Sequence, residues 1–174
     1  MPMRWPLMTL GACLAAGTAC CAPQSAEPAP TAESEAGSVH PVSGLEVIPL
    51  TVSQNGKEHR FRVEVAKTEA EQAQGLMFRT EMGPDEGMLF PTERPQARSF
   101  WMKNTVIPLD LIFIGPDGLV TNIAPNAVPY SLEPIPSSGP AIAVLELNGG
   151  RAAELGITAG ARVTWDREAA LTGN

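Results

Sequence analysis

Short runs in which apolar and polar residues alternate dominate this chain, and that pattern is typical of half-buried β-strands. Residues 45–52 and 59–66 form two such runs, and they flank an Asn-Gly pair at positions 55 and 56. Asn-Gly between two alternating runs is a strong signal for a tight hairpin turn. The first part of the folded region is therefore expected to be a β-hairpin.

A short helix is expected after this hairpin. Thr68 and Glu71 have the spacing of a capping box, in which a hydroxyl and a carboxylate each satisfy a free backbone N–H at the start of a helix. Apolar positions continue to Leu76, and Gly75 is expected to help end the helix.

The rest of the pattern predicts further strands separated by turns and loops. Residues 115–118, Gly-Pro-Asp-Gly, predict a turn, and residues 149–156 predict a helical turn. Prolines predict a loop around Pro91 and Pro95 and an irregular loop over residues 124–140. The expected strands are residues 87–90, 98–103, 109–114, 119–123, 141–147 and 161–165.

Many short strands with one or two short helices indicate a mainly β domain, α+β by content. We expect residues 44–170 to form one compact β-sandwich or barrel-like domain. Residues 141–147 are apolar on both faces except for Glu146, which predicts a central strand.

The beginning of the chain looks like a targeting segment. Residues 1–21 combine Arg4, a short apolar stretch and small residues, as a secretory signal does. Residues 22–43 are rich in Pro, Ala, Ser and Glu, and so few apolar side chains predict a disordered tether. The protein is therefore expected to be exported, and to be periplasmic or anchored to the membrane as a lipoprotein.

The anchor hypothesis depends on Cys20. Thr18 and Ala19 supply the small residues that precede a lipidated cysteine in bacterial lipoproteins, and lipidation of Cys20 is the leading interpretation. Ordinary cleavage around Ala22 is the alternative. All 3 cysteines lie in the leader, so the folded domain is expected to have no disulfide and no thiolate ligand.

Charge narrows the range of partners. The formal net charge is −7, and every charged residue except Arg4 lies after Cys21. An acidic domain without a basic cluster is a poor partner for nucleic acid or anionic lipid. We therefore expect no nucleic-acid partner and membrane contact only through a lipid anchor, which leaves a small ligand or an envelope protein as the partner.

The run FWMKNTVIPLD at residues 100–110 is the most informative stretch, because it places a cation, an amide and a carboxylate among large apolar residues. Together with Arg79 and the segments 75–77, 87–90 and 145–147, it resembles the domain of unknown function 192 family of bacterial and archaeal proteins. The similarity covers roughly residues 45–165. It implies a compact, mainly β domain, often behind a signal peptide or lipid anchor, and it implies no activity.

The charged residues of the matching segments are Arg79, Lys103, Asp110 and Glu146. A carboxylate within an apolar strand, such as that of Glu146, needs an opposite charge or a proton. One interpretation is a structural network in which Arg79 and Lys103 pair with Glu146 and fix the strands against the short helix.

The other interpretation is a pocket for a small ligand, with an aromatic wall beside convergent polar groups. Its candidate ligand-binding residues are Arg79, Trp101, Lys103, Asn104, Asp110 and Glu146. The expected function is then a non-catalytic envelope binding or accessory module, with no catalytic residue, metal or cofactor assigned.

Two alternatives stay open. A small envelope enzyme is one, with Lys103 in the cluster and Asp110 and Glu146 as general acid and base, provided that their surroundings separate their pKa values. The second is metal binding through thioethers, which suit Cu(I), although methionine in a β core usually fills space. The methionines concerned are Met77, Met82, Met88 and Met102.

Overall fold

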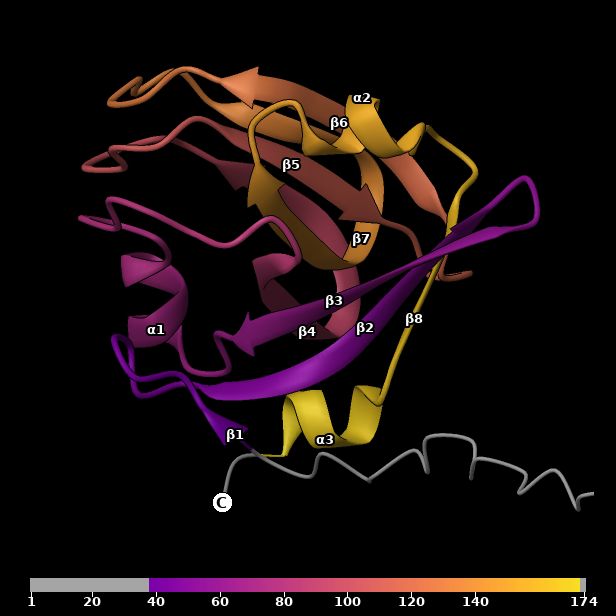
Figure 1. The fold of residues 1–174 in the computed structure, drawn as a ribbon, viewed down its shortest axis with the longest axis horizontal. Helices are drawn as coiled ribbons and strands as arrows, with labels where there is room; N and C mark the ends of the chain where they lie inside the picture. The colour runs from indigo at the N-terminus through magenta and orange to yellow at the C-terminus, as the bar shows by residue number, and fades with distance from the viewer. Residues whose placement is uncertain (1–37, 173–174) are drawn as a thin grey trace, which may run out of the picture. The chain divides into compact units, whose positions relative to one another are not determined.

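The computed structural model describes residues 38–172, which form a β-rich domain with short helices (Figure 1). The predicted signal, Cys20 and nearly all of the predicted tether lie outside the described residues. Within residues 38–172, no helix has the length and apolar character needed to cross a membrane. The strands are β1 (Ser38–Val39), β2 (Glu46–Gln54), β3 (Lys57–Val65), β4 (Glu86–Phe100), β5 (Leu109–Ile114), β6 (Val120–Ala127), β7 (Ile135–Asn148) and β8 (Arg162–Trp165), and the helices are α1 (Glu69–Gln74), α2 (Arg151–Leu155) and α3 (Arg167–Leu171).

The strands form a curled sheet in the order β1-β2-β3-β4-β7-β5-β6, with β8 beside β2. Neighbouring strands are antiparallel except β3 and β4, which are parallel and are connected through α1. β8 also reaches the start of β6, where Leu119 bridges Arg162 and the N–H of Val120 donates to the Ala161 carbonyl at 2.8 Å. Because β8 joins β2 to the start of β6, the sheet curls round on itself, and the predicted mainly β, barrel-like domain is confirmed (Figure 1).

The hairpin turn and the helix start that local sequence motifs predict are both present in the structure. Asn55 and Gly56 have positive φ angles of 52° and 76°, which the hairpin turn between β2 and β3 requires. At the start of α1, the N–H of Glu71 donates to Thr68 Oγ1 at 3.2 Å, and the N–H of Thr68 donates to Glu71 Oε2 at 2.8 Å. The predicted hairpin and capping box are therefore confirmed, although α1 itself ends at Gln74.

The central strands β4, β7 and β5 bury apolar side chains on both faces. We call the cluster on one face the first core; it includes Val63, Leu89, Ile112 and Leu145, and α2 and α3 contribute Ala152 and Ala170 to it. The second core covers the other face, under α1 and the segment after β4, and includes Leu76, Phe90, Met102, Leu111, Phe113 and Val144. Residues 141–147 lie between β4 and β5, so the predicted central strand is confirmed.

Two proline-containing segments form strands where the sequence predicts loops. β4 continues through Pro91 and Pro95, and its pairing with β7 shifts register between Pro91 and Gln96. Such bulges accommodate prolines, which have no N–H for the ladder. The predicted loop at 124–140 is also too long, because β6 extends to Ala127 and β7 begins at Ile135.

The helix α3 has no counterpart among the predicted elements. Asp166 Oδ1 accepts from the N–H of Ala169 at 3.0 Å and caps its start. Lys67 Nζ donates to the carbonyls of Ala169 and Thr172 at 2.7 Å each and contacts Glu46 Oε2 at 2.6 Å. A distant lysine thus holds the end of this short helix, which explains why local sequence does not reveal it.

Candidate functional site

A pocket of about 350 Å³ lies on the side of the second core, and we call it the Glu146 pocket. The helix α1 and residues 75–77 form one of its walls, and the end of β4 with residues 101–105 forms another. Glu146 reaches it from the central strand β7. The pocket therefore lies between the predicted motif and the helix that the capping box starts.

Glu146 is a buried carboxyl group without a partner. Its residue is 5 % exposed, and it lies across from Met88 on β4 and Leu111 on β5, which are both fully buried. Within residues 38–172, no cation and no hydrogen-bond donor pairs with this carboxyl. Burial raises the pKa of Glu146 to about 8, because apolar surroundings disfavour the charged form. At neutral pH the group is mostly a neutral acid, which can both donate and accept a hydrogen bond.

Two glycines allow the backbone to approach closely around this carboxyl. A Cβ on Gly87 would lie 2.6 Å from the Glu146 carbonyl oxygen and 2.8 Å from Leu147 Cδ2, so only glycine lets β4 pair with β7 at this point. Gly75 ends α1 with a φ of 47°, and a Cβ there would lie 3.2 Å from Phe90 Cζ.

Aromatic rings and two cations surround the pocket. Trp101 is 51 % exposed, and Lys103 Nζ lies 5.3 Å from the centre of its ring. Arg98 lies over the Phe100 ring at 5.1 Å and donates through Nη2 to Gln72 Oε1 at 3.0 Å. Partial burial lowers the pKa of Arg98 from its usual value, yet a guanidinium keeps its charge at neutral pH.

The motif segment is fixed by hydrogen bonds to two other connections. Asn104 has a φ of 55°, and its carbonyl accepts from the N–H of Phe78, after α1, at 2.8 Å. The Thr105 carbonyl accepts from the N–H of Tyr130, in the β6–β7 connection, at 3.2 Å. These connections lie at one end of the sheet, on the left in Figure 1.

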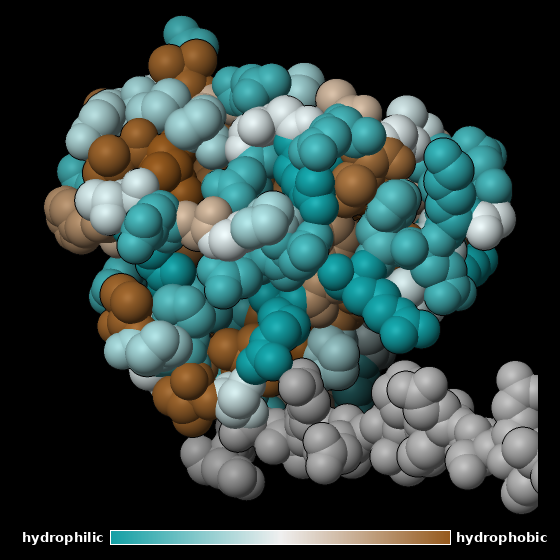
Figure 2. Space-filling view, viewed as in Figure 1, coloured by the Kyte–Doolittle hydropathy of each residue, from teal (hydrophilic) through white to brown (hydrophobic). Residues whose placement is uncertain are grey.

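Apolar side chains are exposed near this end of the sheet as well. On the face in Figure 2, such residues occur in small groups separated by polar ones. Those that belong to the three hydrogen-bonded connections are Phe78, Trp101, Val106, Val128, Tyr130 and Leu132.

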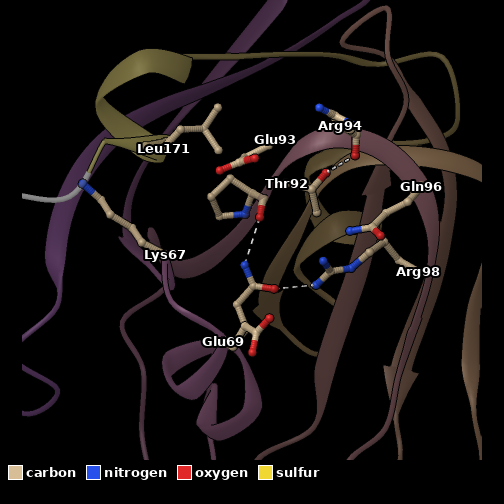
Figure 3. A pocket seen from close by; sticks show the side chains of 11 residues that line it. Lys67, Glu69, Thr92, Glu93, Arg94, Gln96, Arg98 and Leu171 are labelled. Atoms are coloured by element: carbon tan, nitrogen blue, oxygen red, sulfur yellow. Dashed lines mark hydrogen bonds between the residues drawn. The ribbon is translucent and has the colours of Figure 1, made fainter.

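A second pocket of about 420 Å³ lies beside the first and shares Gln72 and Arg98 with it. Figure 3 shows Lys67 on one side of it and Arg98 on the other. Two of its polar groups already have partners: Lys67 holds α3, and the Thr92 hydroxyl donates to the Arg94 carbonyl at 3.0 Å. Since the unpaired buried carboxyl is in the Glu146 pocket, that pocket is the stronger candidate site.

Arg79 does not reach Glu146. Its Nη1 and Nη2 each lie 2.9 Å from a carboxylate oxygen of Glu64, which is 2 % exposed, and His40 Nε2 lies 3.6 Å from the same group. The predicted pairing of Arg79 with Glu146 is therefore wrong, because the cation has a different buried partner. Sequence analysis did not single out Glu64, since it lies in an ordinary alternating strand.

Asp110 is also separated from Glu146. Side chains alternate along strands, and Asp110 pairs in register with Leu147 of the first core, whereas Glu146 pairs with Leu111 of the second core. The two carboxyls thus lie on opposite faces of the sheet and do not form an acid-base pair.

Asp110 instead accepts hydrogen bonds from three backbone N–H groups. Its Oδ1 binds those of Asn126 at 2.8 Å and Gly150 at 2.9 Å, and its Oδ2 binds that of Ala152 at 2.8 Å. These bonds fasten the start of α2 to β5 and β6, so the arrangement is that of a structural group.

The structure brings together three of the six candidate site residues in the Glu146 pocket: Trp101, Lys103 and Glu146. It adds Arg98 and Gln72, which carry no recognisable motif and were missed. Asn104 supports the neighbouring turn, and its Nδ2 lies 3.8 Å from Met77 Sδ. Lys103 has no carboxylate partner within the described residues, so its predicted pairing with Glu146 is wrong as well.

Two of the four methionines considered as metal ligands are packing residues. Met88 and Met102 are 0 % and 1 % exposed and belong to the second core. In residues 38–172, no group of three or more His, Cys, Asp or Glu side chains is arranged to hold a metal ion.

A protein family and several solved structures are similar to this chain. The profile of the domain of unknown function 192 family, described as "Uncharacterized ACR", matches residues 50–165. A crystal structure of a protein of unknown function from Novosphingobium aromaticivorans DSM 12444 is 58% identical, with a TM-score of 0.74 over 76% of this chain and 95% of that chain. A putative transcription regulator from Sinorhizobium meliloti 1021 is 39% identical, with a TM-score of 0.69 over 73% of this chain and 97% of that chain. No curated protein matches the chain.

Proposed function

This chain belongs to the domain of unknown function 192 family, and we propose that it is a non-catalytic binding module that takes a small ligand in the Glu146 pocket. A volume of about 350 Å³ suits a ligand of that class, since such pockets usually start near 300 Å³. The exposed ring of Trp101 offers it an apolar contact.

The observation that carries this proposal is the unpaired carboxyl of Glu146. Burying a polar group without a hydrogen bond is destabilising, and folded proteins leave few such groups unsatisfied. The other buried carboxyls have partners: Glu64 binds Arg79, and Asp110 binds backbone N–H groups. Within the described residues, Glu146 has neither kind of partner and lines the pocket, so a ligand there can supply its hydrogen bond.

The nature of the partner follows partly from charge. The net charge of −7 disfavours binding of nucleic acid, so we propose that the partner is a small molecule or a segment of an envelope protein. Enzymatic acid-base chemistry between Asp110 and Glu146 receives no support, because the two lie on opposite faces of the sheet.

We further propose that the protein is exported, as a periplasmic protein or a lipoprotein anchored at Cys20. The leader and the tether of the sequence support this location. Mass spectrometry of the protein recovered from a bacterial envelope tests it. Diacylglycerol on Cys20 is the expected result. An N-terminus generated after Ala22 would contradict the lipid anchor and indicate ordinary secretion.

Ligand binding is tested with a variant that fills the pocket. Ser99 lines the Glu146 pocket and is exposed, so Ser99→Trp should block its entrance without disturbing a core. Ser138→Trp is the matched control, because Ser138 is an exposed residue of β7 that does not line this pocket. The full-length proteins are compared by thermal shift against small carboxylates, amines, sugars and peptides.

We expect at least one compound class to raise the melting temperature of the wild type and of Ser138→Trp but not of Ser99→Trp. Equal shifts in all three proteins would place the binding elsewhere. A complete lack of shifts would contradict the proposed function.

A further inference from the structure

We infer that the ligand of the Glu146 pocket is a carboxylate on an apolar body, bound by Glu146 as a neutral hydrogen-bond donor and by Lys103 and Arg98 as cations. This inference rests on the proposed binding function and specifies the chemical class of its ligand.

The charges that face the pocket support an anion. Arg98 from β4, Lys103 from the segment after β4 and Glu146 from β7 are the charged residues that line it within the described chain. The helix α1 contributes uncharged amides such as Gln72, and β5 places the apolar Leu111 next to Glu146. With Glu146 protonated at neutral pH, two positive charges face the pocket of a chain whose net charge is −7. These positive charges attract an anion to the pocket and repel a protonated amine.

Lys103 is available for such an anion. Lys67 and Arg79 are held by carboxylates, those of Glu46 and Glu64 respectively. Lys103 instead lies over Trp101, and an exposed cation-π contact of this kind is weak. Its ammonium group can therefore turn toward a bound carboxylate at little cost.

Glu146 complements a carboxylate in a different way. A neutral carboxylic acid donates a short, charge-assisted hydrogen bond to a carboxylate, whereas an ionised Glu146 would repel it. The pocket therefore offers one buried donor from the sheet and two cations nearer to solvent.

The walls between these groups suit an apolar body. Phe90 and Phe100 line the pocket and contact each other edge to face, with their ring centres 5.1 Å apart. Leu76 and Met77 line it from the side of α1. An aromatic or short aliphatic group fits against these surfaces.

The experiment compares three probes with the same body: 3-phenylpropionate, 3-phenylpropylamine and 3-phenylpropanol. Each is titrated into the full chain at pH 7, and the indole N–H signal of Trp101 is followed by NMR. Trp165 serves as an internal reference, because it lines a different pocket. We expect 3-phenylpropionate to cause a saturable shift at Trp101 and to bind at least tenfold more tightly than the other two.

Two variants test the assigned roles. Since binding requires the proton on Glu146, the affinity of the wild type for 3-phenylpropionate should fall about tenfold between pH 7 and pH 9. Glu146→Gln carries an amide donor that does not titrate, so the affinity of this variant should not decline between pH 7 and pH 9. Lys103→Met should weaken binding at least fivefold, whereas Lys57→Met, in the distant β2–β3 hairpin, should not change it.

The outcomes separate the inference from the function on which it rests. Tighter binding of the amine, abolished by Glu146→Gln, would overturn the inference and leave a binding pocket for cations. Equal binding of the alcohol, or a pH decline that persists in Glu146→Gln, would also overturn it. If none of the probes shifts Trp101 at millimolar concentration, the inference fails, whereas the binding function is decided separately by the thermal-shift comparison of the wild type with Ser99→Trp.

Discussion

Three buried carboxyl groups of this domain lie in three different environments. Asp110 accepts hydrogen bonds from backbone N–H groups, Glu64 pairs with Arg79, and Glu146 has no partner within the described residues. The first two are fixed by their partners and hold elements together. The third lines a pocket with its hydrogen-bonding capacity unused, which is why it distinguishes the site from the rest of the core.

Replacing Glu146 by glutamine should change how stability depends on pH. The folded protein keeps a proton on Glu146 up to a pH of about 8, whereas the unfolded chain releases it near the ordinary value of 4.5. Between these values the folded state binds more protons, so the contribution of Glu146 to stability is complete below pH 4.5 and is lost as pH rises toward 8. The free energy of unfolding of the wild type, relative to Glu146→Gln, should fall by about 1 kcal/mol per pH unit in this window.

Urea denaturation at pH 5, 6.5 and 8 measures this difference. Glu133→Gln is the control, because Glu133 is exposed and should leave the slope unchanged. Parallel curves for the wild type and Glu146→Gln would show that Glu146 titrates normally.

Asp110→Asn should destabilise the fold by about 1–3 kcal/mol. The amide keeps one acceptor oxygen but turns an NH₂ group toward a backbone N–H, so at least one of the three bonds is lost in a fully buried place. Asp117→Asn, in the exposed turn before β6, should change stability far less, because its oxygen still accepts from Leu119. Chemical denaturation of both variants measures their free energies of unfolding. Equal stability of the two would contradict the structural role of Asp110.

At the scale of elements, β4 determines the shape of the site. It pairs in parallel with β3 and antiparallel with β7, and its bulge near Pro91 bends it before it reaches Arg98 and Phe100. Its first half pairs with Glu146, and its second half forms a wall of the pocket. One strand therefore positions both the carboxyl and the aromatic side of the site.

Gly87→Ala tests the close approach of β4 and β7. The added Cβ would lie 2.6 Å from the Glu146 carbonyl oxygen, and the strands must separate to admit it. We expect a loss of about 1–3 kcal/mol in unfolding free energy, together with altered amide NMR signals around Glu146. Gly139→Ala, on the same strand as Glu146, is the control, because nothing lies within 4 Å of a Cβ there. If Gly87→Ala is tolerated as well as this control, the close approach is not a constraint.

At the scale of the whole domain, the C-terminal elements complete the structure. β8 joins β2 to the start of β6, and α3 then packs Ala170 into the first core. Lys67, which follows β3, fastens the end of α3 through two carbonyls and contacts Glu46. The end of the described chain is thus attached to its beginning.

Lys67→Met should release α3 while leaving the barrel folded. We expect faster amide hydrogen exchange over Arg167–Leu171 and a loss of about 1–3 kcal/mol in unfolding free energy, because charge-assisted hydrogen bonds to Ala169 and Thr172 disappear. Lys57→Met, at the exposed start of β3, is the matched control. Unchanged exchange in α3 would mean that Ala170 alone holds the helix.

Sequence reasoning succeeded where structure depends on neighbours in the chain. The Asn-Gly turn and the capping box of Thr68 and Glu71 involve residues at most three positions apart, so they can be recognised locally. It failed at Pro91 and at residues 124–140, where proline predicts a loop but a bulge or a strand end accommodates it.

The site shows the same division. The sequence by itself determined a mainly β domain and identified Trp101, Lys103 and Glu146 as residues that a plain strand does not need. Only the tertiary structure decided which charges meet: Arg79 with Glu64, Asp110 with backbone N–H groups, and Glu146 with none in the described chain. The physical reason is that alternation along each strand assigns a side chain to a face, whereas strand order and register decide what lies opposite it.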